Sequence, residues 1–376
     1  MKVIVIGAGI LGASTAYQLS KSGAEVLIID RKDKGQATDA AAGIICPWLS
    51  QRRNKAWYRL VQAGARYYAE LIAALEAEGE TDTGYARVGA LNVHTDMEKI
   101  AKLEQRANEK LADAPEIGNI TRFDEAATRE SFPILADGYQ ALHVSGAARV
   151  DGRALRDALI RSAIRRGASL INGDAVLEYE ANNRITGVTV GTELYPADKV
   201  IVCAGAWAAS VFKPLGIEFE VSYQKAQIMH VELEERDAQT GEWPVIMPPN
   251  DQYLLAFDKQ RIVIGATHEN GITGYDTRIT PGGMQEVLDK GLTLAPRLAG
   301  STFLEMRVGF RPFTADFLPV FGTVPGWDNL LTGNGLGASG LTAGPFIGSQ
   351  LAKLALGMEP DLEIGDYGVA KAMGKT

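Results

Sequence analysis

The first thirty residues consist of two short apolar runs with a helical pattern between them. Residues 3–6 and 26–29 are continuously apolar, as is typical of strands buried on both faces of a parallel sheet. Between them Ala16, Tyr17 and Leu19 recur at helical spacing, and Gly23 stands where a helix commonly ends. The pattern predicts one strand–helix–strand unit that closes at Asp30.

Further along, the pattern changes from mixed helix and strand to alternation. Residues 31–50 predict a loop, and residues 57–78, with apolar side chains at intervals of three and four, predict an amphipathic helix. Asp151 is placed to cap a helix that ends at Gly167. Short strands are expected at 169–171, 175–177, 187–190, 199–203 and 329–332, and a final helix at 341–356. Residues 218–307 alternate as in a mostly antiparallel sheet.

The order of these elements predicts an α/β protein in which one domain is interrupted by another. A chain of 376 residues is long enough for two cores. We expect a discontinuous nucleotide-binding domain made of residues 1–84, 148–217 and 305–376. Residues 85–147 and 218–304 are expected to form an inserted α+β substrate domain with a mostly antiparallel sheet.

Composition narrows the class of protein. The 38 basic and 46 acidic side chains give a net charge of −8, and no basic cluster is present, which argues against a nucleic-acid partner. Cys46 and Cys203 are not at the spacing of a metal site or a redox pair. No apolar stretch approaches the ~20 residues needed to cross a bilayer. These features predict a cytoplasmic location, and they leave open whether the protein is a homo-oligomer.

The turn after the first strand fits the pattern GxGxxG. Its residues are Gly7, Ala8, Gly9, Ile10, Leu11 and Gly12, followed by the acidic end of the second strand at Asp30, Arg31 and Lys32. A turn of this kind allows backbone to approach a pyrophosphate at a helix N-terminus, and the acid can accept hydrogen bonds from a ribose. The alternative is that the glycines only shape a connection. The motif alone does not separate NAD from FAD.

A second glycine-rich turn lies near the end of the chain. Residues 333–340 connect an apolar strand to the last helix and lack the GxGxxG spacing. A helix that starts there could direct its positive end at the pyrimidine side of a flavin and stabilise the charge formed on reduction. An ordinary glycine-rich loop is an equally good interpretation of these residues alone.

Taken together, these motifs resemble the D-amino acid oxidase superfamily, in particular glycine oxidase and bacterial D-amino acid dehydrogenases. The resemblance rests on the first glycine turn with Asp30 and Arg31, residues 37–43, residues 200–205 with Trp207, residues 309–312 with Asp316 and Pro319, and the terminal turn. It implies a Rossmann-like domain that binds FAD. Covalent attachment in relatives uses an early histidine or a late cysteine, and this chain has no histidine before His94 and no cysteine after Cys203. We therefore expect noncovalent FAD.

The resemblance also implies further cofactor-binding positions. Beside the first turn and residues 30–32, these are Thr38, Ala41, Ala42, Gly43, Ile44, Val176, Ala204, Gly205, Trp207, Arg311, Gly335, Leu336, Gly337, Ala338, Ser339, Gly340, Leu341 and Thr342. Val176 is expected to meet the adenine side through its backbone.

The candidate catalytic residues are Arg311, Tyr253 and His268. Arg311 matches the family arginine that binds a substrate carboxylate, and its planar fork suits that group. Tyr253 matches a tyrosine of a glycine oxidase hairpin, whereas His268 stands where that hairpin has a methionine. Glycine oxidase also has a second arginine in the terminal turn, where this chain has Ala338 and Ser339. A structural salt bridge remains the alternative for Arg311, and core positions remain the alternative for the other two.

The sequence thus predicts an enzyme that transfers a hydride from the carbon beside the nitrogen of a small amino acid or amine to FAD. Oxygen or a quinone is expected to reoxidise the flavin. Three alternatives stay open: a NAD-linked hydroxy-acid dehydrogenase, a flavoprotein that modifies an aminomethyl group of RNA, and a flavin-binding protein without turnover. The acid excess disfavours RNA, and the terminal glycine turn disfavours NAD.

Overall fold

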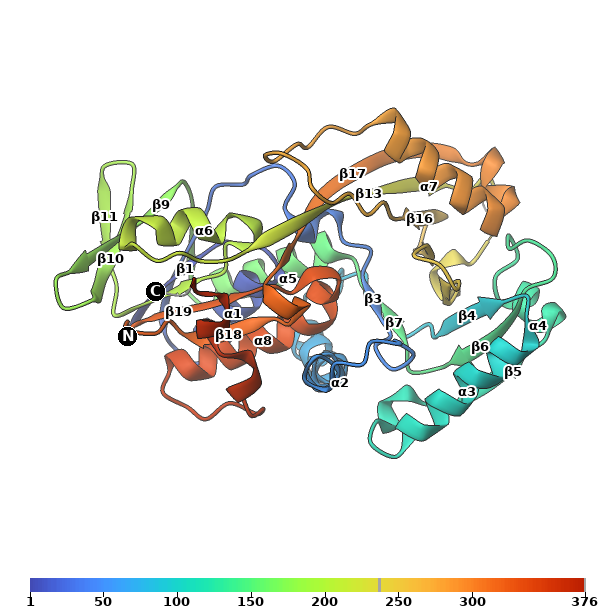
Figure 1. Cartoon of the computed structure of the whole chain (residues 1–376), viewed down its shortest axis with the longest axis horizontal. Coiled ribbons are helices and arrows are strands. Elements are labelled where there is room, and N and C mark those ends of the chain that lie inside the picture. Colours follow the sequence, from blue (N-terminus) through green and yellow to red (C-terminus); the bar gives the residue numbers. More distant parts are fainter. Residues whose placement is uncertain (236–237, 375–376) are drawn as a thin grey trace.

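The computed structural model describes residues 1–235 and 238–374 and contains two large sheets (Figure 1). The first has six strands in the spatial order β18 (Val320–Thr323), β19 (Leu330–Asn334), β12 (Lys199–Val202), β1 (Lys2–Ile6), β2 (Glu25–Asp30) and β8 (Ser169–Asn172). Its strands are parallel except for the edge strand β18.

Both faces of the six-stranded sheet are covered. Val3 and Val5 of β1 pack toward the helices, whereas Ile4 and Ile6 pack toward a three-stranded sheet. The helices are α1 (Ile10–Lys21), α2 (Lys55–Ala77), α5 (Gly152–Arg165) and α8 (Gly340–Ala355). The other face carries β9 (Ala175–Glu180), β10 (Arg184–Val190), β11 (Glu193–Pro196) and α6 (Ala208–Phe212). Burial on both faces explains why β1 is a continuous apolar run.

The second large sheet has eight strands and is mostly antiparallel, with one parallel pair between β14 and β4. Its spatial order is β17 (Thr302–Phe313), β13 (Ser222–Glu232), β16 (Arg261–Gly265), β15 (Tyr253–Ala256), β14 (Val245–Met247), β4 (Ala90–His94), β6 (Gln140–Val144) and β5 (Ile120–Phe123). Helices α7 (Pro281–Leu294) and α4 (Glu125–Ser131) adjoin one face, and α3 (Met97–Leu111) adjoins the other. In Figure 1 this sheet extends to the right of the six-stranded one.

The expected α/β fold with an antiparallel substrate sheet is confirmed, and the differences are local. Helix α7 lies inside residues 218–307, where the alternating pattern predicts strands. The loop expected at 31–50 contains a 3₁₀ turn (Ala37–Ala40) and strand β3 (Ile44–Ile45), which pairs with β7 (Ala148–Arg149). Strand β17 runs across the expected boundary at residue 305, and the domain limits remain a prediction. Among the described residues, no helix has both the length and the apolar character needed to cross a bilayer.

Candidate functional site

A cavity of about 440 Å³ lies along the carboxyl ends of the parallel strands. Ile6, Asp30, Cys203 and Asn334, at or just beyond the ends of β1, β2, β12 and β19, line it on one side. Ala226, Met247 and Tyr253 line it from the eight-stranded sheet. The carboxyl edge of a parallel α/β sheet is where such folds bind their ligands.

The three glycines of the first turn differ in what surrounds them. Gly7 has φ +101°, and a Cβ there would lie 2.4 Å from the carbonyl oxygen of Cys203. A Cβ on Gly12 would lie 1.8 Å from the carbonyl oxygen of Gly7. At Gly9 the nearest atom would be Thr38 Oγ1 at 3.3 Å, and Gly9 lines the cavity. The fold therefore requires glycine at positions 7 and 12. At position 9 the glycine borders the cavity, where a ligand could approach the backbone.

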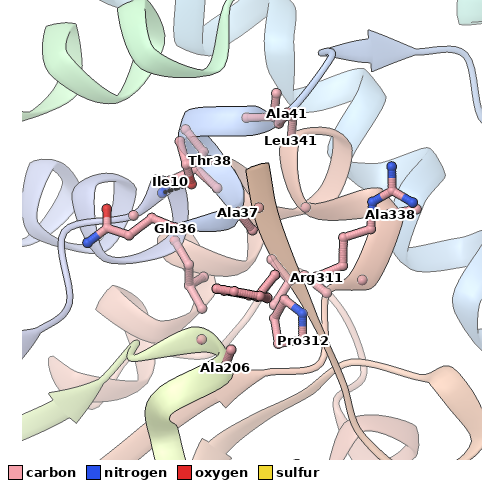
Figure 2. Close-up of a pocket in the computed structure, with 18 of the residues that line it drawn as sticks. Ile10, Gln36, Ala37, Thr38, Ala41, Ala206, Arg311, Pro312, Ala338 and Leu341 are labelled. Carbon is pink, nitrogen blue, oxygen red and sulfur yellow. Dashed lines mark hydrogen bonds between the residues drawn. The ribbon is translucent and has the colours of Figure 1, made fainter. Parts of the chain in front are cut away.

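Helix α1 begins at this turn without a capping side chain on Gly9. Thr38 Oγ1 accepts a hydrogen bond from the Ile10 backbone N–H at 2.9 Å, which joins the loop of residues 36–44 to the helix start. Figure 2 shows Ile10, Thr38 and Gln36 on the same side of the cavity. A helix N-terminus whose cap residue has no side chain is suited to bind an anionic group such as a pyrophosphate.

The Asp30 carboxylate is buried and already holds the surrounding loops. It accepts hydrogen bonds from the backbone N–H groups of Ala8 and Lys32, both at 2.6 Å, and from Gln36 Nε2 at 2.9 Å. Each carboxylate oxygen can accept two bonds, so one position on Oδ2 remains for a ligand hydroxyl. Arg31, which also lines the cavity, is paired with Asp33 and Asp174.

The terminal turn forms the opposite part of the wall. Residues 336–342 line the cavity, and α8 begins at Gly340 without a side-chain cap. Gly337 has φ +54° and a Cβ there would meet the Phe313 ring at 2.4 Å, so this position requires glycine. The positive end of α8 therefore adjoins the cavity, as the second glycine turn predicts.

Arg311 lies in β17 and reaches into the cavity. In Figure 2 its side chain extends toward Ala338. Its side-chain partners are neutral: Gln224 Oε1 accepts a hydrogen bond at 3.2 Å, and the Tyr253 hydroxyl is also hydrogen-bonded to the guanidinium. No carboxylate of the described residues lies within ion-pair distance of Arg311. The structural salt bridge considered above is thus absent in the described part of the chain, and the guanidinium is available to an anion.

Tyr253 and His268 come from the β15–β16 hairpin and the segment after it. Tyr253 is paired across the strands with Gly265, and a Cβ on Gly265 would lie 2.3 Å from the Tyr253 hydroxyl oxygen. Burial raises the pKa of Tyr253, and the nearby Arg311 guanidinium partly opposes that shift. Burial lowers the pKa of His268, Arg311 lowers it further, and Asp251 opposes both. Near neutral pH this part of the cavity therefore presents an uncharged phenol and an uncharged imidazole beside the Arg311 guanidinium.

Most of the residues proposed from the sequence line this cavity, and five do not. Ala8 and Lys32 contribute backbone N–H groups to Asp30, and Gly12 packs behind the turn. Gly335 packs against Thr314, and Val176 is an exposed position of β9 beside the lining residues Gly173, Asp174 and Ala175.

Several lining residues were not proposed from the sequence: Gln36, Ala37, Ala206, Met247, Asp251 and Pro312. Met247 and Asp251 precede the hairpin of Tyr253, so their nearness in the chain was a usable signal. Ala37 begins the segment 37–43 that carries the family resemblance, whereas Gln36, just before it, lies in a stretch without periodicity and no pattern marked it.

The known proteins that this chain resembles are oxidoreductases. The family described as "FAD dependent oxidoreductase" matches residues 2–354. The uncharacterised oxidoreductase YurR of Bacillus subtilis is 59% identical over 370 residues, which are 98% of this chain and 99% of YurR. Glycine oxidase of Pseudomonas putida is 26% identical over 381 residues, 99% of each chain. The crystal structure of iminodiacetate oxidase (IdaA) from Chelativorans sp. BNC1 has a TM-score of 0.93 and 45% identity, and covers 97% of this chain and 98% of that chain.

Proposed function

Since the chain belongs to the family of FAD-dependent oxidoreductases, we propose that it oxidises a C–N bond of a small N-substituted amino acid. The resemblance to the D-amino acid oxidase superfamily is confirmed, and the cofactor is FAD. The NAD-linked alternative is therefore wrong. The substrate class is our proposal. That the protein binds FAD noncovalently remains a prediction.

The residues around the cavity fit FAD. A Cβ on Gly9 would point toward the cavity beside the start of α1, with Thr38 Oγ1 at 3.3 Å as its one close protein neighbour. In the proposed arrangement the first turn and Thr38 would hold the pyrophosphate, Asp30 would bind the ribose, and residues 204–207 and 336–342 would surround the flavin. When bound, the cofactor accepts the hydride that leaves the carbon beside the amine nitrogen.

The observation that carries this proposal is Arg311, a guanidinium in the cavity wall whose side-chain partners, the Gln224 amide and the Tyr253 hydroxyl, are both neutral. Arg311 would bind the substrate carboxylate in two bonds, and the neutral Tyr253 hydroxyl would donate a third. His268, with its pKa lowered by burial, would accept a hydrogen bond from the substrate amine. Orientation of the α-carbon would then account for much of the catalysis.

We infer the substrate class from one relative and from two places where this chain differs from the glycine oxidase pattern. Iminodiacetate, after which the 45%-identical relative is named, is a secondary amine that carries two carboxymethyl groups. His268 and the pair Ala338–Ser339 depart from the glycine oxidase pattern, which favours a substrate other than glycine itself. In the proposed reaction the α-carbon loses a hydride and the nitrogen a proton. Water then adds to the resulting imine, the C–N bond breaks, and glyoxylate and an amine are released.

Removing the Arg311 fork should separate substrates by their carboxylate. Arg311→Met should weaken binding of N-methylglycine by roughly ten- to a hundredfold, since a charge-assisted pair contributes about 1.5–3 kcal/mol. Arg311→Lys should restore part of the loss because it keeps the charge without the fork. Rates of anaerobic flavin reduction against substrate concentration measure the effect.

Dimethylamine, which lacks the carboxylate, serves as the matched substrate. It should reduce the flavin of wild type and Arg311→Met at similar rates. Equal losses for both compounds, with FAD content unchanged, would mean that Arg311 supports the fold and does not bind substrate.

A further inference from the structure

A second, smaller cavity of about 300 Å³ adjoins the first. The two share Trp57 and the terminal turn, residues 336–339, as lining. The residues that line only the second cavity are Arg52, Phe313, Asp316 and Phe317. Any group attached to a substrate held at Arg311 and extending past the terminal turn would therefore enter a space that contains an arginine.

Arg52 is half-buried and has no acidic partner. Its guanidinium lies over the Trp57 ring, 4.8 Å from the centroid, and donates a hydrogen bond to the Phe317 carbonyl oxygen. Within the described residues no carboxylate lies within 4 Å of it, although the exposed Asp316 lines the same cavity. Burial lowers the pKa of Arg52, and no neighbouring acid opposes that shift. A partly desolvated guanidinium without a counterion favours an anion.

Trp57 and the terminal turn border both cavities. Trp57 Nε1 donates a hydrogen bond to Ser339 Oγ at 3.1 Å, so Arg52, Trp57 and the terminal turn form one layer. Ala338 and Ser339 lie where the resemblance to glycine oxidase leads us to look for an arginine. Their short side chains leave room beside Arg311, which extends toward Ala338 (Figure 2).

We infer that Arg52 binds a second carboxylate of the substrate, on the branch of the amine that is not held by Arg311. This inference rests on the proposed function, and it selects dicarboxylic secondary amines within that substrate class. Two carboxylates need two cations. The main cavity offers Arg311 and Arg31, and Arg31 is already paired with Asp33 and Asp174 near Asp30. Arg52 supplies the second cation from the adjoining cavity.

Binding of two thioethers that cannot be oxidised at nitrogen tests this role in the holoenzyme. Thiodiacetate carries two carboxylates, and (methylthio)acetate carries one. Their dissociation constants follow from perturbation of the flavin absorbance, and the melting temperature gives an independent readout. Wild type should bind thiodiacetate roughly ten- to a hundredfold more tightly than (methylthio)acetate.

Arg52→Gln should remove most of that difference and leave (methylthio)acetate binding unchanged. Arg52→Lys should retain part of it, because the charge remains. The matched control is Arg53→Gln, which removes the same charge from the next residue, an exposed position that lines neither cavity. It should bind both thioethers as wild type does.

Two results would overturn the inference. Arg52→Gln could weaken the binding of both thioethers equally, or the variant could still bind thiodiacetate more tightly than (methylthio)acetate by the wild-type factor. These outcomes are separate from failure of the proposed function. If no amine reduces the flavin but thiodiacetate still depends on Arg52, the proposed reaction fails and the carboxylate site stands. If iminodiacetate reduces the flavin equally well in wild type and Arg52→Gln, the reaction stands and the site fails.

Discussion

Individual glycines of the first turn serve different purposes. Gly7 and Gly12 are required by the fold, since a Cβ on either would overlap backbone atoms. Gly9 has φ −66° and faces the cavity, so its backbone conformation does not require glycine, and a Cβ there would press on one side-chain atom, Thr38 Oγ1 at 3.3 Å. The close approach of a pyrophosphate would require glycine.

Replacing Gly9 by alanine should therefore affect FAD and leave the protein intact. We expect Gly9→Ala to weaken FAD binding by at least about tenfold, equivalent to ~1.4 kcal/mol, because the methyl group enters the pyrophosphate space. The apoprotein should unfold in urea within about 0.5 kcal/mol of wild type. Titration of apoprotein with FAD and urea denaturation measure the two quantities.

Gly282 provides the control, since it too lies at the start of a helix, in the first turn of α7, and a Cβ there would meet nothing within 4 Å. Gly282→Ala should keep wild-type FAD affinity. Full FAD affinity in Gly9→Ala would mean that the pyrophosphate does not lie at the first turn.

At the residue scale, the sequence identified residues that line the cavity at the first glycine turn and at the end of β2. Spacing alone identified Gly9 and Asp30, because the motif and the acid have fixed separations in a strand–helix–strand unit. It did not reveal that Asp30 also accepts bonds from Ala8, Lys32 and Gln36. Tyr253, His268 and Arg311, which we propose bind substrate, have no such local pattern, and only resemblance to a family pointed to them.

Among the elements, the β15–β16 hairpin positions the part of the cavity wall where we propose the substrate binds. Tyr253 lies across from Gly265, and its ring occupies the space that a side chain at 265 would fill. This packing holds the hydroxyl near Arg311, whose charge partly opposes the rise in the pKa of Tyr253. The hairpin thus couples a glycine outside the cavity lining to the proposed carboxylate site.

Gly265→Ala should act through Tyr253. The added methyl group would displace the ring, and loss of one hydrogen bond to a charged group should weaken binding of N-methylglycine by about 1.5–3 kcal/mol, roughly ten- to a hundredfold. In a Tyr253→Ala background the same change should add little. A double-mutant cycle on dissociation constants measures this coupling. Additive losses would show that Gly265 acts independently of Tyr253.

The elements differed in how well the sequence predicted them. Strands β1 and β2 follow continuous apolar runs, and helix α2 follows a clear helical period. Helix α7 was missed because Gly282, Gly283 and Gly291 lower its helix propensity inside an alternating region. Thr280, whose side chain caps the helix, and Pro281 at its first position were the available signals.

On the scale of the whole molecule, the cavity is assembled from distant parts of the chain. The carboxyl ends of β1, β2, β12 and β19 supply one side, and strands β13, β15 and β17 of the eight-stranded sheet supply another. The interrupted order of helix and strand patterns predicted two sheets. It could not predict how they face each other, because that depends on side-chain packing between segments hundreds of residues apart.

The central claim is that this FAD-dependent oxidoreductase cleaves a C–N bond next to a carboxylate. Anaerobic mixing of the purified holoenzyme with iminodiacetate tests it most directly, with flavin absorbance and released glyoxylate followed together. The account predicts that the flavin bleaches and that glyoxylate and glycine appear in equal amounts, matching the flavin reduced. Flavin that stays oxidised with iminodiacetate, N-methylglycine and glycine, yet is bleached by dithionite, would contradict it.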